Sequence, residues 1–108
     1  MATQGMVTVR KNRRVVLKIV AGCDGWNAVD VARAIRRLKT IPSMTQALAL
    51  AQNHGLGCQK CLLVITATQT LTQCEEEPNP LLRSTFNRSR FNPRWERGTA
   101  DYIKIVDF

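Results

Sequence analysis

Apolar and polar residues alternate along two neighbouring stretches near the start of the chain, residues 6–11 and 14–21. A period of two is typical of a strand with one buried face. The four residues that join the two stretches, 11–14, have the length of a tight turn, and Asn12 is suited to its left-handed position. The pattern therefore predicts a β-hairpin whose tip carries several basic residues.

A glycine-rich turn follows the second of these strands. Gly22 and the pair Asp24-Gly25 allow backbone conformations that β-branched residues resist. Trp26 precedes the expected helix cap and Val31 lies inside the helix, a spacing that predicts a hydrophobic staple between them. On this interpretation Trp26 is buried, and it fixes the angle at which the helix leaves the strand.

The next segment has the period of a helix that ends near residue 38. Asn27 is a good N-cap, so we expect its side chain to accept the amide of Asp30. The apolar stripe comprises Ala28, Val31, Ile35 and Leu38, and the wetter side carries Asp30, Arg33, Arg36 and Arg37. One face of this helix is therefore basic.

A second helix is predicted after Pro42, which cannot continue the first one. The sequence Ser43-Met44-Thr45-Gln46 has the form of a capping box, and Gly55 stands where a glycine in the left-handed conformation would close the helix. We expect Leu56 to fold back on the last turn. The core face contains Met44, Ala47, Leu48 and Ala51.

Two further strands are predicted, at residues 61–72 and 101–107. Residues 61–72 begin apolar on both faces, which favours a central place in a sheet, and then alternate with threonine, so one face of the sheet is expected to contact water. These elements predict a two-layer α+β fold with a mostly antiparallel four-stranded sheet and two helices on one face. The order of the strands stays open.

Residues 75–100 connect the last two predicted strands and show neither the period of a helix nor that of a strand. A connection of this length inside a compact domain is usually functional or mobile. Arginines and aromatic residues are interleaved in it, namely Arg83, Phe86, Arg88, Arg90, Phe91, Arg94, Trp95 and Arg97. They are candidates for gripping phosphates and stacking on unpaired bases. Alternatively, the guanidinium groups and rings pair with one another and tie the loop down.

The order of elements and the turn Asp24-Gly25-Trp26 give the chain a resemblance to a family of small uncharacterised bacterial and phage proteins. Members of that family carry a D-G-aromatic turn after a hairpin and end in a strand similar to the one that reads YIKIVDF here. Gly22 and Cys23 stand where the family has His and Trp, and Asn27 replaces its Pro. The resemblance implies the fold and carries no activity with it.

Net charge is the most informative property of the composition. The 108 residues suffice for a single domain, 1–108, with a core of its own, and 44% of them are apolar. A formal net charge of +8 and a pI near 10.1 favour polyanionic partners, either a nucleic acid or an acidic protein. Since the chain has no apolar run of membrane-spanning length and no leader-like start, we expect a cytoplasmic protein without membrane contact.

Four potential zinc ligands occur in the pattern H-x3-C-x2-C-x12-C, namely His54, Cys58, Cys61 and Cys74. Thiolate and imidazole groups at such spacing can hold tetrahedral zinc. The alternative is that the cysteines are ordinary reduced thiols and that His54 caps the second helix. Cys23 is interpreted as a small buried residue.

Catalytic motifs are absent from the sequence. There is one histidine, and neither a G-x-S-x-G motif nor a glycine-rich phosphate loop occurs. The sequence therefore predicts a basic, non-enzymatic binding protein that contacts single-stranded nucleic acid, with an adaptor for an acidic protein, or a small zinc domain, as alternatives. Its predicted contact residues are Arg83, Arg88, Arg90, Phe91, Arg94, Trp95 and Arg97.

Overall fold

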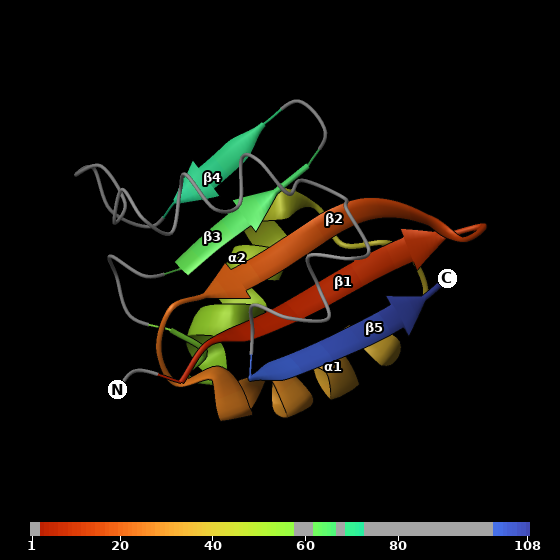
Figure 1. Ribbon diagram of the computed structural model, residues 1–108. Helices are drawn as coiled ribbons and strands as arrows, with labels where there is room; N and C mark the ends of the chain where they lie inside the picture. Colours follow the sequence, from red (N-terminus) through yellow and green to blue (C-terminus); the bar gives the residue numbers. More distant parts are fainter. Residues whose placement is uncertain (1–2, 58–61, 67–68, 73–100) are drawn as a thin grey trace.

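The computed structural model describes residues 3–57, 62–66, 69–72 and 101–108. In these residues the strands are β1 (Gly5–Lys11), β2 (Arg14–Ala21), β3 (Leu62–Ile65), β4 (Thr70–Thr72) and β5 (Tyr102–Asp107), and the helices are the 3-10 turn η1 (Gly25–Asn27), α1 (Ala28–Arg36) and α2 (Met44–Asn53). The strands form one sheet in the order β4-β3-β2-β1-β5 (Figure 1). The α+β class is confirmed.

Pairing within the sheet is mixed but mostly antiparallel. The pairs β1–β2, β2–β3 and β3–β4 are antiparallel, whereas β5 runs parallel to β1 with Met6 opposite Ile103. Both helices lie on the same side of the sheet in Figure 1. The first and the last strand in the sequence are therefore neighbours, because β5 is hydrogen-bonded to β1.

The prediction of one continuous strand at residues 61–72 is wrong in its continuity. β3 ends at Ile65, and the Thr66 N–H donates to the Gln69 carbonyl (2.9 Å) while the Thr66 hydroxyl accepts from the Gln69 N–H (3.1 Å). A threonine hydroxyl that binds a nearby backbone amide competes with the strand ladder. The chain therefore reverses here, and β4 returns antiparallel to β3.

The tip of the β1–β2 hairpin is a two-residue turn. Asn12 and Arg13 have φ values of 54° and 65°, so both central residues are left-handed, as a type I′ turn requires. The predicted left-handed conformation of Asn12 is confirmed. This turn also explains why the tip exposes three basic side chains at close spacing, those of Lys11, Arg13 and Arg14.

The main core lies between the sheet and the two helices. Its sheet side is supplied by alternate residues of β1, β2, β3 and β5, and its helix side by the apolar stripes of α1 and α2. The buried members with branched side chains are Val7, Val9, Leu17, Ile19, Val31, Ile35, Leu56, Leu62, Val64 and Val106. The predicted packing of both helices on one face is confirmed.

The opposite face of the sheet is buried at its centre, contrary to the expectation of a water-facing surface. Met6, Val20, Leu63 and Ile65 form a separate apolar cluster there. Lys18, which lies opposite Thr8 in the ladder, is only 2% exposed. Alternate residues of β1 and β2 are therefore buried on both faces of the sheet. The period of two in the sequence does not by itself show that one face contacts water.

The turn before α1 depends on a close approach of two backbones. A Cβ atom placed on Gly25 would lie 2.3 Å from the Gln4 carbonyl carbon, and one on Gly5 would lie 2.6 Å from the Gly25 Cα. The Gly25 N–H donates to the Thr3 carbonyl (2.9 Å), which fixes the contact. Gly25 is therefore required for proximity, whereas the left-handed residue of this turn is Asp24, with φ 54°.

Two predictions at the start of α1 are wrong. Trp26 lies in the 3-10 turn Gly25–Asn27 and is 50% exposed, so it does not form a buried staple with Val31. Asn27 makes no side-chain cap bond to α1, and its amide donates to the Gly55 carbonyl (2.9 Å). Asn27 therefore joins the beginning of α1 to the end of α2.

The predicted ends of α2 are confirmed. The Ser43 hydroxyl accepts from the Gln46 N–H (3.1 Å), as an N-cap does. At the other end Gly55 has φ 72°, and the Leu56 N–H donates to the Ala51 carbonyl (2.9 Å). This is the 6→1 bond of a Schellman motif, and the buried Leu56 side chain supplies its hydrophobic contact.

Candidate nucleic-acid interface

Three arginines form a row along the solvent side of α1. Arg33, Arg36 and Arg37 are spaced by three and four residues, so they share one face of the helix, and all three are exposed. They lie at the C-terminal end of α1, where the helix dipole favours positive charge. The helix can therefore carry this concentration of like charge.

The row continues onto the edge of the sheet. An Arg36 Nη2 donates to the Ile105 carbonyl (3.0 Å), so the helix and β5 are joined directly. Lys104 is the neighbour of Ile105, and its ladder partner is Val7, which belongs to the helix-side core. Lys104 therefore stands on the same side of the sheet as the arginines. The bond from Arg36 also covers a carbonyl on the open edge of β5, a common protection of edge strands.

The hairpin tip reaches the same region. Lys11, Arg13 and Arg14 are exposed at the tip, and Lys11 lines a pocket together with Lys39 of the α1–α2 connection. Figure 1 shows the hairpin tip, the C-terminal end of α1 and the end of β5 on the same side of the molecule. We call these groups the basic surface: Lys11, Arg13, Arg14, Arg33, Arg36, Arg37, Lys39 and Lys104.

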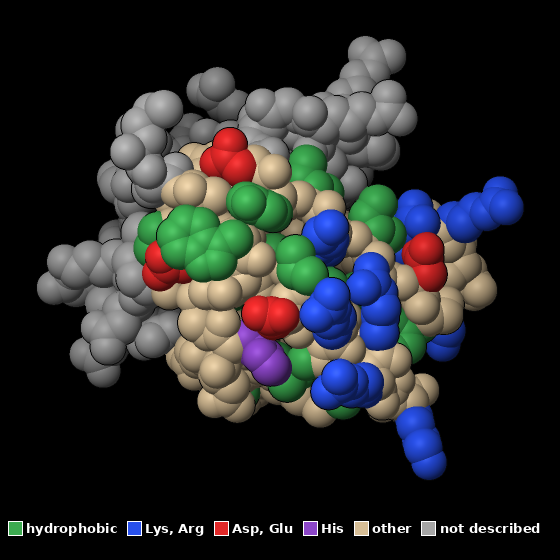
Figure 2. Space-filling model, turned by 90° about the horizontal axis from the view of Figure 1, so that it is seen from below, with side chains coloured by type: hydrophobic (Ala, Val, Ile, Leu, Met, Phe, Trp, Pro, Cys, Tyr) green, Lys and Arg blue, Asp and Glu red, His purple; other side chains and the backbone are tan. Residues whose placement is uncertain are grey.

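Figure 2 shows part of this surface from below, with Lys and Arg side chains gathered over one half of the view. The acidic residue at the end of β5, Asp107, points to the other face of the sheet, because the preceding residue, Val106, belongs to the helix-side core. Arg10 Nε donates to Asp107 Oδ1 (2.7 Å) and Arg10 Nη2 to Asp107 Oδ2 (2.9 Å), a bidentate pair. The carboxylate of Asp107 is thus paired with Arg10. It does not compensate the positive charge of the basic surface.

This pair gives a prediction about acid stability. The pKa of Asp107 lies below its ordinary value of 3.8, mainly because Arg10 donates a hydrogen bond to the ionised form. A lowered pKa in the folded state means that the pair stabilises the fold fully above pH 3.8 and loses this contribution as the pH falls through the folded value. Thermal unfolding between pH 7 and pH 2 should therefore show a steeper acid loss for the parent than for Asp107→Asn. Parallel profiles for the two proteins would contradict the pairing.

Two exposed aromatic side chains lie at the other end of this side of the molecule. Trp26 is 50% exposed and Tyr102 39%. They belong to one neighbourhood, because Gly25 contacts Gly5 and Gly5 is the ladder partner of Tyr102. The place of Trp26 beside the turn is one sequence signal for exposure, but the staple spacing predicted burial instead.

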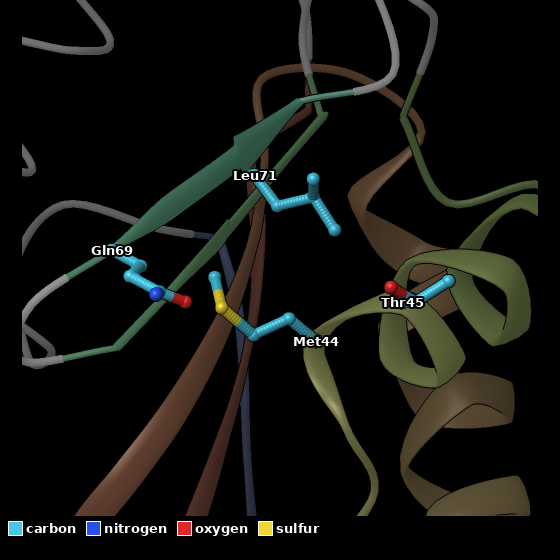
Figure 3. A pocket seen from close by; sticks show the side chains of 4 residues that line it. All are labelled: Met44, Thr45, Gln69 and Leu71. Carbon is cyan, nitrogen blue, oxygen red and sulfur yellow. The ribbon is translucent and has the colours of Figure 1, made fainter.

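A second hollow separates the start of α2 from β4. Met44, Thr45, Gln69 and Leu71 line a pocket of about 350 Å³. Figure 3 shows the Met44 side chain extending from α2 toward Gln69, while Leu71 points from β4 toward the helix. Met44 is half-buried and packs against the main core, as its helical spacing predicted. The lining holds no charged group, so this pocket offers nothing to a phosphate.

The contact residues predicted from the sequence, Arg83, Arg88, Arg90, Phe91, Arg94, Trp95 and Arg97, lie outside the described residues, as do the zinc candidates Cys58, Cys61 and Cys74. Their roles stay predictions. His54 is exposed at the C-terminal end of α2, where capping was expected. Within the part of the chain that the structure describes, no three His, Cys, Asp or Glu side chains are grouped as a metal site would need.

Comparison with known proteins gives no family: no family model, no curated protein and no solved structure matches the chain. Among the described helices, none has the length and apolar character needed to cross a membrane. The basic surface and the exposed aromatic side chains are therefore the features from which a function can be inferred.

Proposed function

We propose that this protein is a non-enzymatic binding protein that holds single-stranded nucleic acid on the basic surface. The observation that carries the proposal is the meeting of α1, β5 and the hairpin tip through the Arg36–Ile105 bond and the pocket shared by Lys11 and Lys39. Cations gathered on one side of a molecule can bind a phosphate backbone and release its counterions.

Single strands are favoured over duplexes because aromatic rings are exposed on the same side of the molecule as the basic surface. Trp26 and Tyr102 present aromatic surface that an unpaired base can stack on, whereas the bases of a duplex are already stacked. Three carboxylates, Asp24, Asp30 and Asp101, lie near the aromatic end. The strand backbone would therefore follow the arginines of α1, and only its bases would approach the rings.

The test measures the salt dependence of binding. A fluorescein-labelled oligonucleotide of about 12 nucleotides, single-stranded or annealed, is titrated by anisotropy at several salt concentrations. For a single strand, log K falls with log salt by about 0.7 for each neutralised phosphate. The variant Arg33→Gln/Arg37→Gln/Lys104→Gln should therefore flatten the slope by about 2 units.

The matched control removes the same charge elsewhere. Arg88→Gln/Arg90→Gln/Arg94→Gln also lowers the formal net charge of +8 by three, and it tests the loop predicted from the sequence. A larger effect of the α1–β5 variant supports the basic surface, and a larger effect of the loop variant replaces it by the loop. If the parent binds no oligonucleotide, nucleic acid is the wrong partner and an acidic protein takes its place.

Trp26→Ala separates a binding role from a structural one. Because half of the ring is exposed, the substitution should reduce the free energy of unfolding by less than about 1 kcal/mol, far below the cost of emptying a core site. It should weaken oligonucleotide binding by about 1 to 3 kcal/mol for a stacked base and leave the salt slope unchanged. Trp26→Phe, which keeps a ring, is the control. A large loss of stability without loss of binding would contradict this role.

A further inference from the structure

The pocket between the hairpin tip, the α1–α2 connection and the end of β5 has the composition of a nucleotide subsite. Its lining residues are Lys11, Lys39, Thr40, Ile41 and Phe108, and we call it the tip pocket. Its volume of about 480 Å³ is within the range of small-molecule sites. The inference rests on the proposed function and concerns one part of the same basic surface.

The apolar wall of the tip pocket is held in place by the fold. Ile41 and Phe108 are half-buried and pack against the main core. The Phe108 N–H donates to the Arg10 carbonyl (2.8 Å), which extends the β1–β5 pairing, and the preceding residue, Asp107, binds the Arg10 side chain. A ring positioned in this way is a rigid platform for a flat, apolar partner.

The rim has the opposite chemistry. Lys11 and Lys39 approach the pocket from different segments, and both are exposed, as is Thr40. Ammonium groups on flexible stems are suited to a phosphate, which they bind as point charges, and the threonine hydroxyl adds a donor. A ligand that satisfies both the wall and the rim needs a planar ring and a phosphate in one molecule.

We propose that the tip pocket binds one nucleotide of the strand, with the base on the Phe108 ring and the phosphate between Lys11 and Lys39. Inorganic phosphate alone would leave the apolar wall without a partner, and a nucleoside would leave the two ammonium groups without an anion. A nucleotide contacts the apolar wall and the two ammonium groups at the same time, so it should bind better than phosphate or a nucleoside alone.

Amide chemical shifts under titration test the pocket directly. Uridine monophosphate should shift the amide signals of residues 39–41 and Phe108, and uridine or inorganic phosphate at the same concentration should shift them less. Equal shifts with phosphate alone would reduce the site to general anion attraction and overturn the proposal. Shifts confined to other residues would overturn it as well.

Variants connect the pocket to strand binding. Phe108→Ala should weaken oligonucleotide binding by about 5- to 150-fold, the equivalent of losing one stacked base, with an unchanged salt slope. Phe108→Trp keeps the platform and should bind like the parent. Lys11→Gln/Lys39→Gln, which leaves the core intact, should flatten the slope by about 0.7 units, because the two lysines hold one phosphate.

The outcomes of the two proposals are distinguishable. If the parent binds oligonucleotides and Phe108→Ala binds equally well, the subsite is wrong while the proposed function stands. If the parent binds none, both are wrong. Should Phe108→Ala unfold, the lysine pair and the uridine monophosphate titration decide the matter, since neither disturbs the core.

Discussion

Gly25→Ala should destabilise the fold by about 3 kcal/mol, the upper part of the range for overpacking a tight site. The added Cβ would lie 2.3 Å from the carbonyl carbon and 2.4 Å from the carbonyl oxygen of Gln4, which are backbone atoms that cannot rotate away. The start of β1 or the turn before α1 would have to move, and the Gly25 N–H bond to Thr3 would be strained. Urea unfolding followed by circular dichroism measures the loss.

Gly55→Ala is the matched control, because it adds the same methyl group at a different kind of position. Gly55 has φ 72°, and among the described residues its Cβ would meet only the Asn27 amide, at 3.3 Å. The expected cost is about 1 kcal/mol, that of a left-handed alanine. A loss at Gly25 no larger than the loss at Gly55 would show that the two backbones do not approach as closely as described.

The difference between these two glycines shows what the sequence can reveal about the fold. Gly55 follows an apolar helical pattern, and its role as a helix terminator depends only on local order, so it was predicted correctly. Gly25 has its effect through Gln4 and Gly5, about twenty residues earlier, so the local pattern could suggest a turn but not the contact. The prediction of a buried Trp26 is wrong for the same reason. Trp26 follows Gly25 directly, and its 50% exposure could not be inferred from local spacing.

The candidate interface likewise has some features that the local sequence predicts and others that depend on contacts between distant segments. A basic helix face and a basic hairpin tip are visible in the sequence, because Arg33, Arg36 and Arg37 follow a helical period. The sequence does not show that the helix face and the hairpin tip belong to one surface. This requires β5 to pair parallel with β1 and to bring Lys104 beside α1. The tip pocket likewise joins three distant segments, and no spacing within one segment could indicate it.

Ile35→Ala is the second change with a large expected effect. Ile35 is fully buried in the main core, on the side of α1 that faces the sheet, one position before Arg36. Truncating it removes buried methyl groups and leaves a cavity, which costs about 3 kcal/mol for residues of this size in well-packed cores. The loss is measured by chemical denaturation, with Val29→Ala as the control. Val29 is half-buried on the same helix, so its truncation should cost about 1 kcal/mol or less.

The same variant separates fold from binding. Small domains are stable by about 5 to 15 kcal/mol, so the Ile35→Ala protein should stay mostly folded at low temperature. The folded protein keeps Arg33, Arg36 and Arg37 on the solvent side of α1, and it should therefore bind the single-stranded oligonucleotide with the salt slope of the parent. Binding should then disappear over the range in which the helix signal melts. A folded Ile35→Ala protein with a flattened slope would mean that α1 does not present its arginines independently of the core, and the proposed interface would have to be abandoned.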